Sequence, residues 1–314
     1  MTSSADMTAR VGSVVLPNPV MTASGTSGHG AELAPYFDLG TLGAVVVKSL
    51  SAQPWPGNPP LRVHETASGM LNSVGLQGPG VEAWLEHDLP ALVAAGARVV
   101  ASIWGSSVAD YELAARLLAS APADVIAVEV NLSCPNTEAA RDLFAHSESA
   151  TEDAIAATAA CARPRWAKLS PNVTDLVPIA AAARRGGAEA VTLVNTVMGL
   201  AIDPDSGAYR LGSGARGGGL SGPAIHPVAV RAVHDVHAAV PDLPIIGVGG
   251  VVTGADAAEL MLAGASAIQV GTATFANPRA PARVLTELLR WGGQAPGRSP
   301  LAQIVGSAHR KESA

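Results

Sequence analysis

Short apolar segments recur along the chain, and most are continuous rather than alternating. They lie at about residues 19–23, 44–48, 98–103, 125–131, 165–169, 190–195, 243–248 and 267–270. Unbroken runs of this length, rich in β-branched residues, predict parallel strands covered on both faces. Amphipathic stretches at about residues 108–121, 174–185, 227–240 and 255–263 predict helices between them. Strands and helices that alternate in this way predict an α/β fold, a (β/α)8 TIM barrel.

The barrel is predicted to form a single domain over residues 1–314, because no linker divides the sequence. Two segments rich in proline, glycine and polar residues interrupt the alternation, at about residues 51–79 and 199–223. We interpret them as inserted, irregular active-site loops. The polar tail after about residue 292 is expected to be loosely held.

Charge and cysteine content narrow the possible partners. The net charge of −6 and the scattered basic residues argue against nucleic-acid binding. No apolar run approaches the roughly 20 residues of a membrane span, and no apolar signal segment follows the N-terminus. Two cysteines are too few for a disulfide scaffold, so a cytoplasmic location is expected.

Polar and glycine residues follow the predicted strands at their C-terminal ends, where barrel enzymes carry their active sites. They are Ser24, Lys48, Ser49, Ser102, Asn131, Cys134, Lys168, Asn195, Thr196, Gly249, Gly250, Gly271 and Thr272. The glycine-rich turns after the last two strands indicate a phosphate-bearing cofactor, because exposed backbone N–H groups bind anions. A lysine that ends an apolar strand needs an anionic or hydrogen-bonding partner.

Four asparagines extend this picture, because an amide both donates and accepts hydrogen bonds. Asn72, Asn131, Asn136 and Asn195 together suit a small polar ring with alternating C=O and N–H groups. Cys134 lies just past a strand end and is interpreted as functional.

Three other features are interpreted as structural. Cys161 falls on a predicted helix and is interpreted as inert packing. The GxGxxG match at residues 212–217 lacks the flanking strand and helix of a dinucleotide site, so we interpret it as a flexible loop. His234 and His237 have no third ligand at metal-binding spacing, and no metal site is predicted.

The segments NPVMTASGT, VVKS, GMLNSVGLQGPG, VNLSCPN, KLSPNVTD, VNTVMG, GLSGPAI, GVGG and GTATF occur in this order from about residue 16 to residue 281. In order and spacing they resemble class 1 dihydroorotate dehydrogenases. The resemblance implies an FMN-dependent oxidation of dihydroorotate to orotate in pyrimidine biosynthesis. It implies that Cys134 is the base that takes the C5 proton, while flavin N5 accepts the C6 hydride.

The resemblance also carries the binding residues of the family onto this sequence. The implied orotate contacts are Lys48, Asn72, Ser73, Val74, Gly75, Leu76, Asn131, Asn136, Asn195 and Thr196. The implied FMN contacts are Ser24, Lys48, Ser49, Ser102, Asn131, Lys168, Val194, Gly222, Gly249, Gly250, Gly271 and Thr272. Ser102 is a departure, because the family often has asparagine there, and Trp104 is bulkier than the family pattern.

The sequence looks most similar to the B subtype, whose catalytic chain works with a second subunit that carries FAD and an iron–sulfur cluster. This resemblance implies that the chain forms a homodimer, or a heterotetramer with this second subunit. Electrons would then pass to NAD through the second subunit. Two cysteines could not hold such a cluster in this chain alone.

Other readings stay open at this point. A fumarate-using A-subtype enzyme and a related pyrimidine reductase use similar flavin chemistry. A Schiff-base aldolase would use Lys48 or Lys168 on a phosphate-binding barrel, although it has no use for a cysteine among asparagines. A catalytically silent scaffold is the third alternative.

Overall fold

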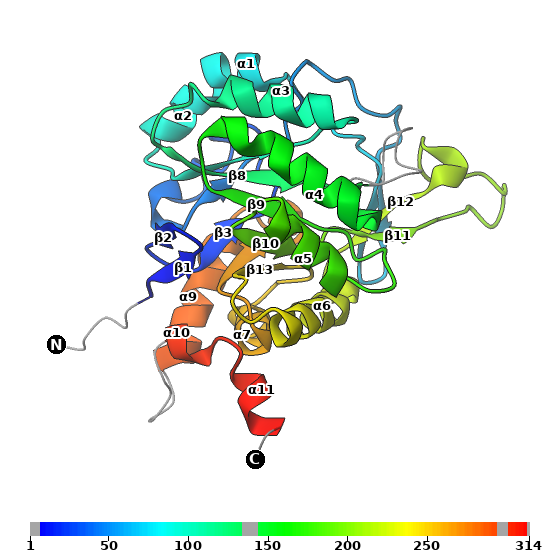
Figure 1. Ribbon diagram of the computed structural model, residues 1–314. Helices are drawn as coiled ribbons and strands as arrows, with labels where there is room; N and C mark the ends of the chain where they lie inside the picture. Colours follow the sequence, from blue (N-terminus) through cyan, green and yellow to red (C-terminus); the bar gives the residue numbers. More distant parts are fainter. Residues whose placement is uncertain (1–6, 134–143, 294–300, 313–314) are drawn as a thin grey trace.

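The computed structural model describes residues 7–133, 144–293 and 301–312, and its centre is a barrel of eight parallel strands (Figure 1). Neighbouring strands follow the order β3–β14–β13–β10–β9–β8–β7–β4. A parallel bridge between Met21 and Ala44 closes β4 onto β3. The strands are β3 Val20–Thr22, β4 Val45–Val46, β7 Val99–Ile103, β8 Val125–Asn131, β9 Arg165–Lys168, β10 Ala190–Leu193, β13 Ile245–Val248 and β14 Ala267–Val270. Each falls inside a predicted segment, so the (β/α)8 prediction is confirmed.

Helices surround this barrel on its outer face (Figure 1). They are α1 Val81–Ala83, α2 Leu89–Ala94, α3 Val108–Leu118, α4 Glu148–Ala157, α5 Val177–Arg185, α6 His226–Ala239, α7 Gly254–Ala263, α8 Ala273–Ala276, α9 Ala280–Gly293, α10 Leu301–Ile304 and α11 Ser307–Glu312. Local sequence fixes their ends, as α7 illustrates. Thr253 caps α7 in a reciprocal pair with Asp256, and Gly264 ends the helix with a φ of 133°.

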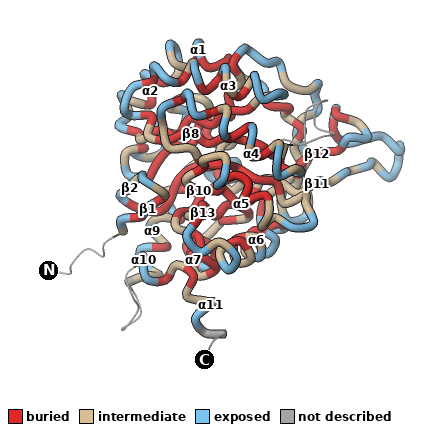
Figure 2. Tube along the Cα trace, in the orientation of Figure 1, coloured by how far each residue is buried: buried red, intermediate tan, exposed pale blue. Residues whose placement is uncertain are grey.

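Two apolar clusters hold the barrel together. Figure 2 shows that central strands such as β8, β10 and β13 are buried. The larger cluster joins strand residues such as Val128 and Val191 to helix residues such as Leu118 and Val233. The smaller one includes Trp166, Met21, Val46 and Ile246 together with the hairpin β1 Ala9–Val11 and β2 Val14–Leu16. Outward and inward side chains of the same strands are therefore both buried, which explains their unbroken hydrophobicity.

The sequence led us to expect irregular loops in the two insertions, but parts of both form strands. They pair with each other into a four-stranded antiparallel sheet of order β11–β12–β6–β5. Its strands are β5 Val63–Thr66, β6 Gly69–Asn72, β11 Val197–Gly199 and β12 Gly218–Ser221. β12 pairs with β6 although the two lie almost 150 residues apart, as in the pairing of Gly219 with Asn72. The prediction was wrong because this pairing is non-local and leaves no periodic signal in either segment.

Beyond the barrel, α10 and α11 lie in the tail that the sequence predicted to be loosely held. Ile304 is buried there, and the Gly306 N–H donates to the Met261 carbonyl at the end of α7. Among the described residues no helix is long and apolar enough to cross a membrane.

Candidate functional site

A pocket opens at the C-terminal ends of the barrel strands, beside the inserted sheet. Its lining brings together most of the residues that the sequence singled out: Ser24, Lys48, Ser49, Asn72, Val74, Gly75, Leu76, Asn131, Lys168, Val194, Asn195, Thr196, Gly222, Gly249, Gly250, Gly271 and Thr272. Neighbouring parallel strands end at the same rim, so residues far apart in sequence meet there. The predicted polar rim is therefore one site.

Two predicted site residues in the described part of the chain, Ser73 and Ser102, do not line this pocket, and two others fall outside that part. Cys134 and Asn136 lie outside the described residues, and Ser133 is the last described residue before them. Ser73 is fully buried, and its hydroxyl accepts a hydrogen bond from Asn58 Nδ2 at 2.9 Å. Ser102 is also fully buried and contacts Ser49 rather than the pocket. The structure therefore places Ser73 and Ser102 behind the lining, where they support it.

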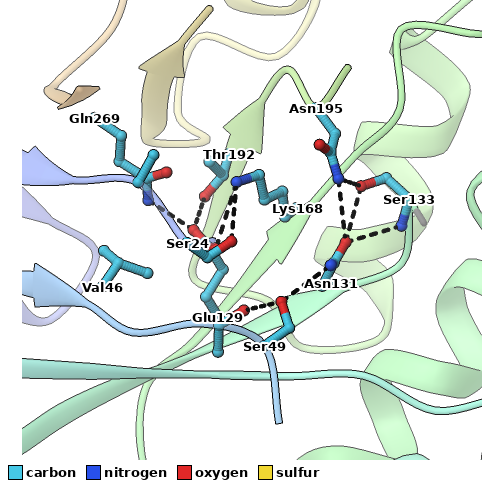
Figure 3. Close-up of polar contacts among 12 residues, drawn as sticks. Ser24, Val46, Ser49, Glu129, Asn131, Ser133, Lys168, Thr192, Asn195 and Gln269 are labelled. Carbon is cyan, nitrogen blue, oxygen red and sulfur yellow. Dashed lines mark hydrogen bonds and ion pairs between the residues drawn. The ribbon is translucent and has the colours of Figure 1, made fainter. Parts of the chain in front are cut away.

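An amide and hydroxyl cluster forms one wall of the pocket (Figure 3). Asn131 Nδ2 donates to Ser49 Oγ at 3.1 Å, and Asn131 Oδ1 accepts from the hydroxyl of Ser133 at 2.9 Å. Asn195 Nδ2 donates to Ser133 Oγ at 2.7 Å. These contacts fix which way the two amides face, and each amide keeps hydrogen-bonding capacity for a ligand. The wall runs into Ser133, the residue directly before Cys134.

Lys168 lines another part of the pocket and is only 3% exposed. Its Nζ donates to Ser24 Oγ at 3.2 Å and lies 3.7 Å from Glu129 Oε1 (Figure 3). Glu129 is fully buried, and its Oε2 accepts hydrogen bonds from Thr192 and Gln269. A buried ammonium is costly without a counter-charge, and this carboxylate provides one.

Sequence reasoning missed Glu129 as a functional candidate. One signal was available: a single acidic residue stands inside the otherwise apolar run VIAVEVN. The sequence predicted that Lys168 needs an anionic or hydrogen-bonding partner, and within the protein Glu129 and Ser24 take these two roles. The sequence alone could not identify Glu129 as the anion.

Glycine turns complete the rim, and their backbone geometry requires glycine. Gly250 has a φ of +68°, and a Cβ added there would lie 2.6 Å from the His226 Cβ. Gly222 has a φ of +96°, and a Cβ there would lie 2.7 Å from the Gly69 Cα. Without side chains, the backbone at these turns is open to a ligand in the pocket.

Several pocket residues were not predicted as site residues. They are Ala23, Gly25, Thr26, Val63, Met70, Ser221, Ile225, Val248 and Phe275. Ser221 had a signal in the segment GLSGPAI, and its hydroxyl accepts from Thr272 Oγ1 at 2.8 Å. Val63 and Met70 come from the inserted sheet, whose pairing the sequence did not reveal. Among the described residues, no group of histidine, cysteine or acidic side chains is arranged to hold a metal ion.

Comparison with known proteins adds to this geometry. The family model described as dihydroorotate dehydrogenase matches residues 7–291. The chain is 48% identical to the dihydroorotate dehydrogenase B (NAD(+)) catalytic subunit of Alkaliphilus metalliredigens, over 89% of this chain and 91% of that protein. It is 46% identical to the protein of the same name from Desulforudis audaxviator, over 96% of both chains.

Two further comparisons bear on subtype and fold. A putative dihydroorotate dehydrogenase A (fumarate) of Solibacter usitatus is 47% identical, over 88% of this chain and 90% of that protein. A crystal structure of DHODH in complex with ferulenol, from Eimeria tenella, superposes with a TM-score of 0.79 over 97% of this chain and 89% of that one. Its sequence identity is 22%, so this structure supports the barrel fold alone.

Proposed function

The chain belongs to the dihydroorotate dehydrogenase family, and we propose that it oxidises dihydroorotate to orotate with FMN in this pocket. The observation that carries the proposal is the convergence of the Asn131–Ser133–Asn195 wall and the Lys168–Glu129 pair on one pocket. An aldolase would need a reactive lysine, whereas Lys168 is paired with a carboxylate here.

The residues present fit both the phosphate and the ring of FMN. The glycine turns at Gly222, Gly249 and Gly250 offer backbone to a phosphate where a side chain would clash. Lys168 provides a buried cation for an electron-rich ring, and Ser24 holds that cation in place. We propose that these residues, with Lys48, Ser49, Asn131, Val194, Gly271 and Thr272, hold the cofactor. When bound, FMN supplies the acceptor for the C6 hydride of the substrate.

The substrate ring carries alternating C=O and N–H groups, which suit the amides of the pocket. We propose that Asn72, Asn131 and Asn195 orient it, with Asn136 and Thr196 adding further hydrogen bonds. Lys48 and the segment Val74–Leu76 complete the set of proposed substrate contacts. The positive charge of Lys48 suits the carboxylate of dihydroorotate. Trp55 Nε1 donates to the Gly75 carbonyl at 2.9 Å, which holds this segment against the pocket.

Cys134 is proposed as the base that removes the C5 proton. It directly follows Ser133, whose hydroxyl bonds to both Asn131 and Asn195. The residue directly before Cys134 is therefore held in place by two hydrogen bonds. A thiol has an ordinary pKa of about 8.5, so Cys134 must lose its proton and become a thiolate before it can take up the C5 proton.

The two subtypes differ in their final electron acceptor, NAD or fumarate, and we propose that this chain belongs to the NAD-linked B subtype. Most of the relatives described above carry that name, and they are catalytic subunits, which implies a partner subunit for electron transfer. We infer that FAD and the iron–sulfur cluster lie on that partner, because this chain has two cysteines. The relative named as a fumarate enzyme makes the A subtype the second candidate.

Absorbance spectroscopy of the purified chain tests the proposal. We expect a bound flavin whose visible absorbance bleaches when dihydroorotate is added without oxygen. A colourless protein that gains no flavin from added FMN would contradict the cofactor assignment. Acceptor profiling then separates the subtypes: poor NAD reduction by the isolated chain supports the B subtype, and rapid fumarate reduction supports the A subtype.

A further inference from the structure

A group of polar side chains lies inside the barrel next to the pocket, and the proposed function uses it only through the pairing of Glu129 with Lys168. Glu129, Thr192 and Gln269 form this group, and all three are fully buried (Figure 3). They lie on three different strands, β8, β10 and β14. A charged residue in such a position is rarely retained for packing alone, because apolar residues of similar volume are often at least as stable.

The two carboxylate oxygens of Glu129 have different surroundings. Oε2 accepts from Thr192 Oγ1 at 3.1 Å and from Gln269 Nε2 at 2.7 Å. Oε1 accepts no hydrogen bond from any described residue and lies 3.7 Å from Lys168 Nζ. Thr192 and Gln269 therefore hold the carboxylate in place, while its other oxygen faces the ammonium.

Lys168 in turn connects this group to the pocket. Its side chain is 4% exposed, and its Nζ donates to Ser24 Oγ. Ser24 is a neutral acceptor, so Glu129 is the counter-charge for Lys168 among the described residues. Glu129 therefore connects Thr192 and Gln269 to Lys168, and Lys168 lines the pocket.

We propose that Glu129 is a positioning residue that holds Lys168 as a cation beneath the flavin. The inference rests on the proposed function, since Lys168 acts on the flavin only if FMN occupies the pocket. A fixed positive charge near the ring stabilises the electron-rich reduced flavin and raises its reduction potential. Glu129 does not touch the flavin in this scheme, and it acts only through Lys168.

The test compares E129Q, K168M and the double variant E129Q/K168M. In E129Q the amide oxygen can keep both hydrogen bonds of Oε2, so the substitution removes the charge and little volume. We expect the flavin potential of E129Q to fall by about 30 mV, the equivalent of a tenfold change in a two-electron equilibrium. The double variant is expected to lie no lower in potential than K168M, because the loss of Glu129 cannot lower the potential further once the lysine is gone.

T192V is the matched control, because it removes a neutral hydrogen bond from the same carboxylate. We expect it to lower the thermal midpoint while the potential changes by less than about 10 mV, a twofold equivalent. A shift in T192V as large as that in E129Q would show a general disturbance of the barrel and overturn the charge assignment. An unchanged potential in E129Q, or losses that add in the double variant, would also overturn it.

Thermal unfolding of the apo chains gives a second readout that does not need FMN. Removing one member of a buried ion pair leaves the other member buried without its counter-charge, so the remaining group must stay charged at a cost or be neutralised at a cost. The double variant is therefore expected to melt above either single variant. If E129Q alone does not fold, the proposal requires the double variant to fold, and its failure to do so would contradict the pairing. A wild-type chain that takes up no FMN would instead contradict the proposed function and leave this thermal coupling intact.

Discussion

The hydroxyls of Ser49 and Ser102 lie 2.9 Å apart, although 53 residues separate them in the sequence. Ser49 also accepts a hydrogen bond from Asn131 Nδ2 at 3.1 Å. Ser102 therefore acts on the pocket through Ser49, and its own side chain is fully buried. A serine at this position, where the family often has asparagine, fits a supporting contact.

Replacing Ser102 with alanine is expected to weaken the wall without removing a ligand contact. S102A takes one hydrogen bond from Ser49, so we expect a loss of about 1 kcal/mol in the free energy of unfolding. We also expect a two- to fivefold fall in kcat/KM, about 0.4–1 kcal/mol. Urea unfolding and steady-state kinetics measure both, with S120A on an exposed helix end as control. Equal effects of S102A and S120A would argue against the supporting role.

Cys134 gives the most direct test of the chemistry. C134A is expected to keep its FMN and to lose at least about 100-fold in turnover, the lower end of a general base's usual contribution. C134S is expected to be slow and to recover rate at high pH, because a hydroxyl is a weaker base than a thiolate. Flavin absorbance and pre-steady-state bleaching by dihydroorotate provide the measurement.

Cys161 serves as the control for the cysteine substitutions. It is fully buried in the larger apolar cluster, and it does not follow the end of β8 as Cys134 does. Burial raises the pKa of the Cys161 thiol, which keeps it protonated and unreactive. C161A is expected to cost stability and to leave turnover within about twofold. Near-normal turnover in C134A would refute the assigned base.

The barrel could be predicted from the sequence because its signal is local. Each strand is a short apolar run, and burial on both faces of the sheet removes the alternation that a half-exposed strand would show. The rim residues followed from the same reasoning, since strand ends converge in a closed barrel. Lys48, Asn131 and Lys168 meet in the pocket for this reason.

The inserted sheet and the group around Glu129 could not be predicted in this way. Leu71 pairs with Leu220 across almost 150 residues, and single-sequence periodicity contains no information on such a partner. Glu129 stands in an apolar run, but nothing in the run shows that Thr192 and Gln269 face it from two other strands. Both the inserted sheet and the contacts of Glu129 depend on segments that are distant in the sequence, and a local pattern does not reveal such contacts.

Trp55 provides a test of how the insertion supports the substrate segment. Its indole Nε1 donates to the Gly75 carbonyl, and its ring packs edge-on against Trp104 at 5.6 Å. W55A removes both contacts, so we expect KM for dihydroorotate to rise about five- to tenfold while kcat falls less than twofold, as for loss of uniform binding. W55F keeps the ring contact but loses the N–H donor, so its KM is expected to lie between the values of the wild-type chain and W55A. A fall in kcat with an unchanged KM would contradict this assignment.

Two half-buried histidines, His29 and His237, predict how stability depends on pH. Burial lowers the pKa of His29 and of His237 below the ordinary value of 6.5, and the neighbouring His309 and His234 lower that of His237 further. The unfolded chain therefore binds protons at a higher pH than the folded chain does. Stability from this source is fully present above about pH 6.5 and is lost as the pH falls below it.

The measurement is the urea midpoint between about pH 7.5 and pH 5.5, a range chosen to lie above most carboxylate pKa values. In the wild-type chain we expect the midpoint to change little down to about pH 6.5 and to fall below that pH. His237 packs beside His309, with ring centroids 5.0 Å apart, and His309 lies on α11. H237Q removes one titrating group from this contact, so its midpoint is expected to depend less on pH. An equal slope in both proteins would show that His237 is not a source of the dependence.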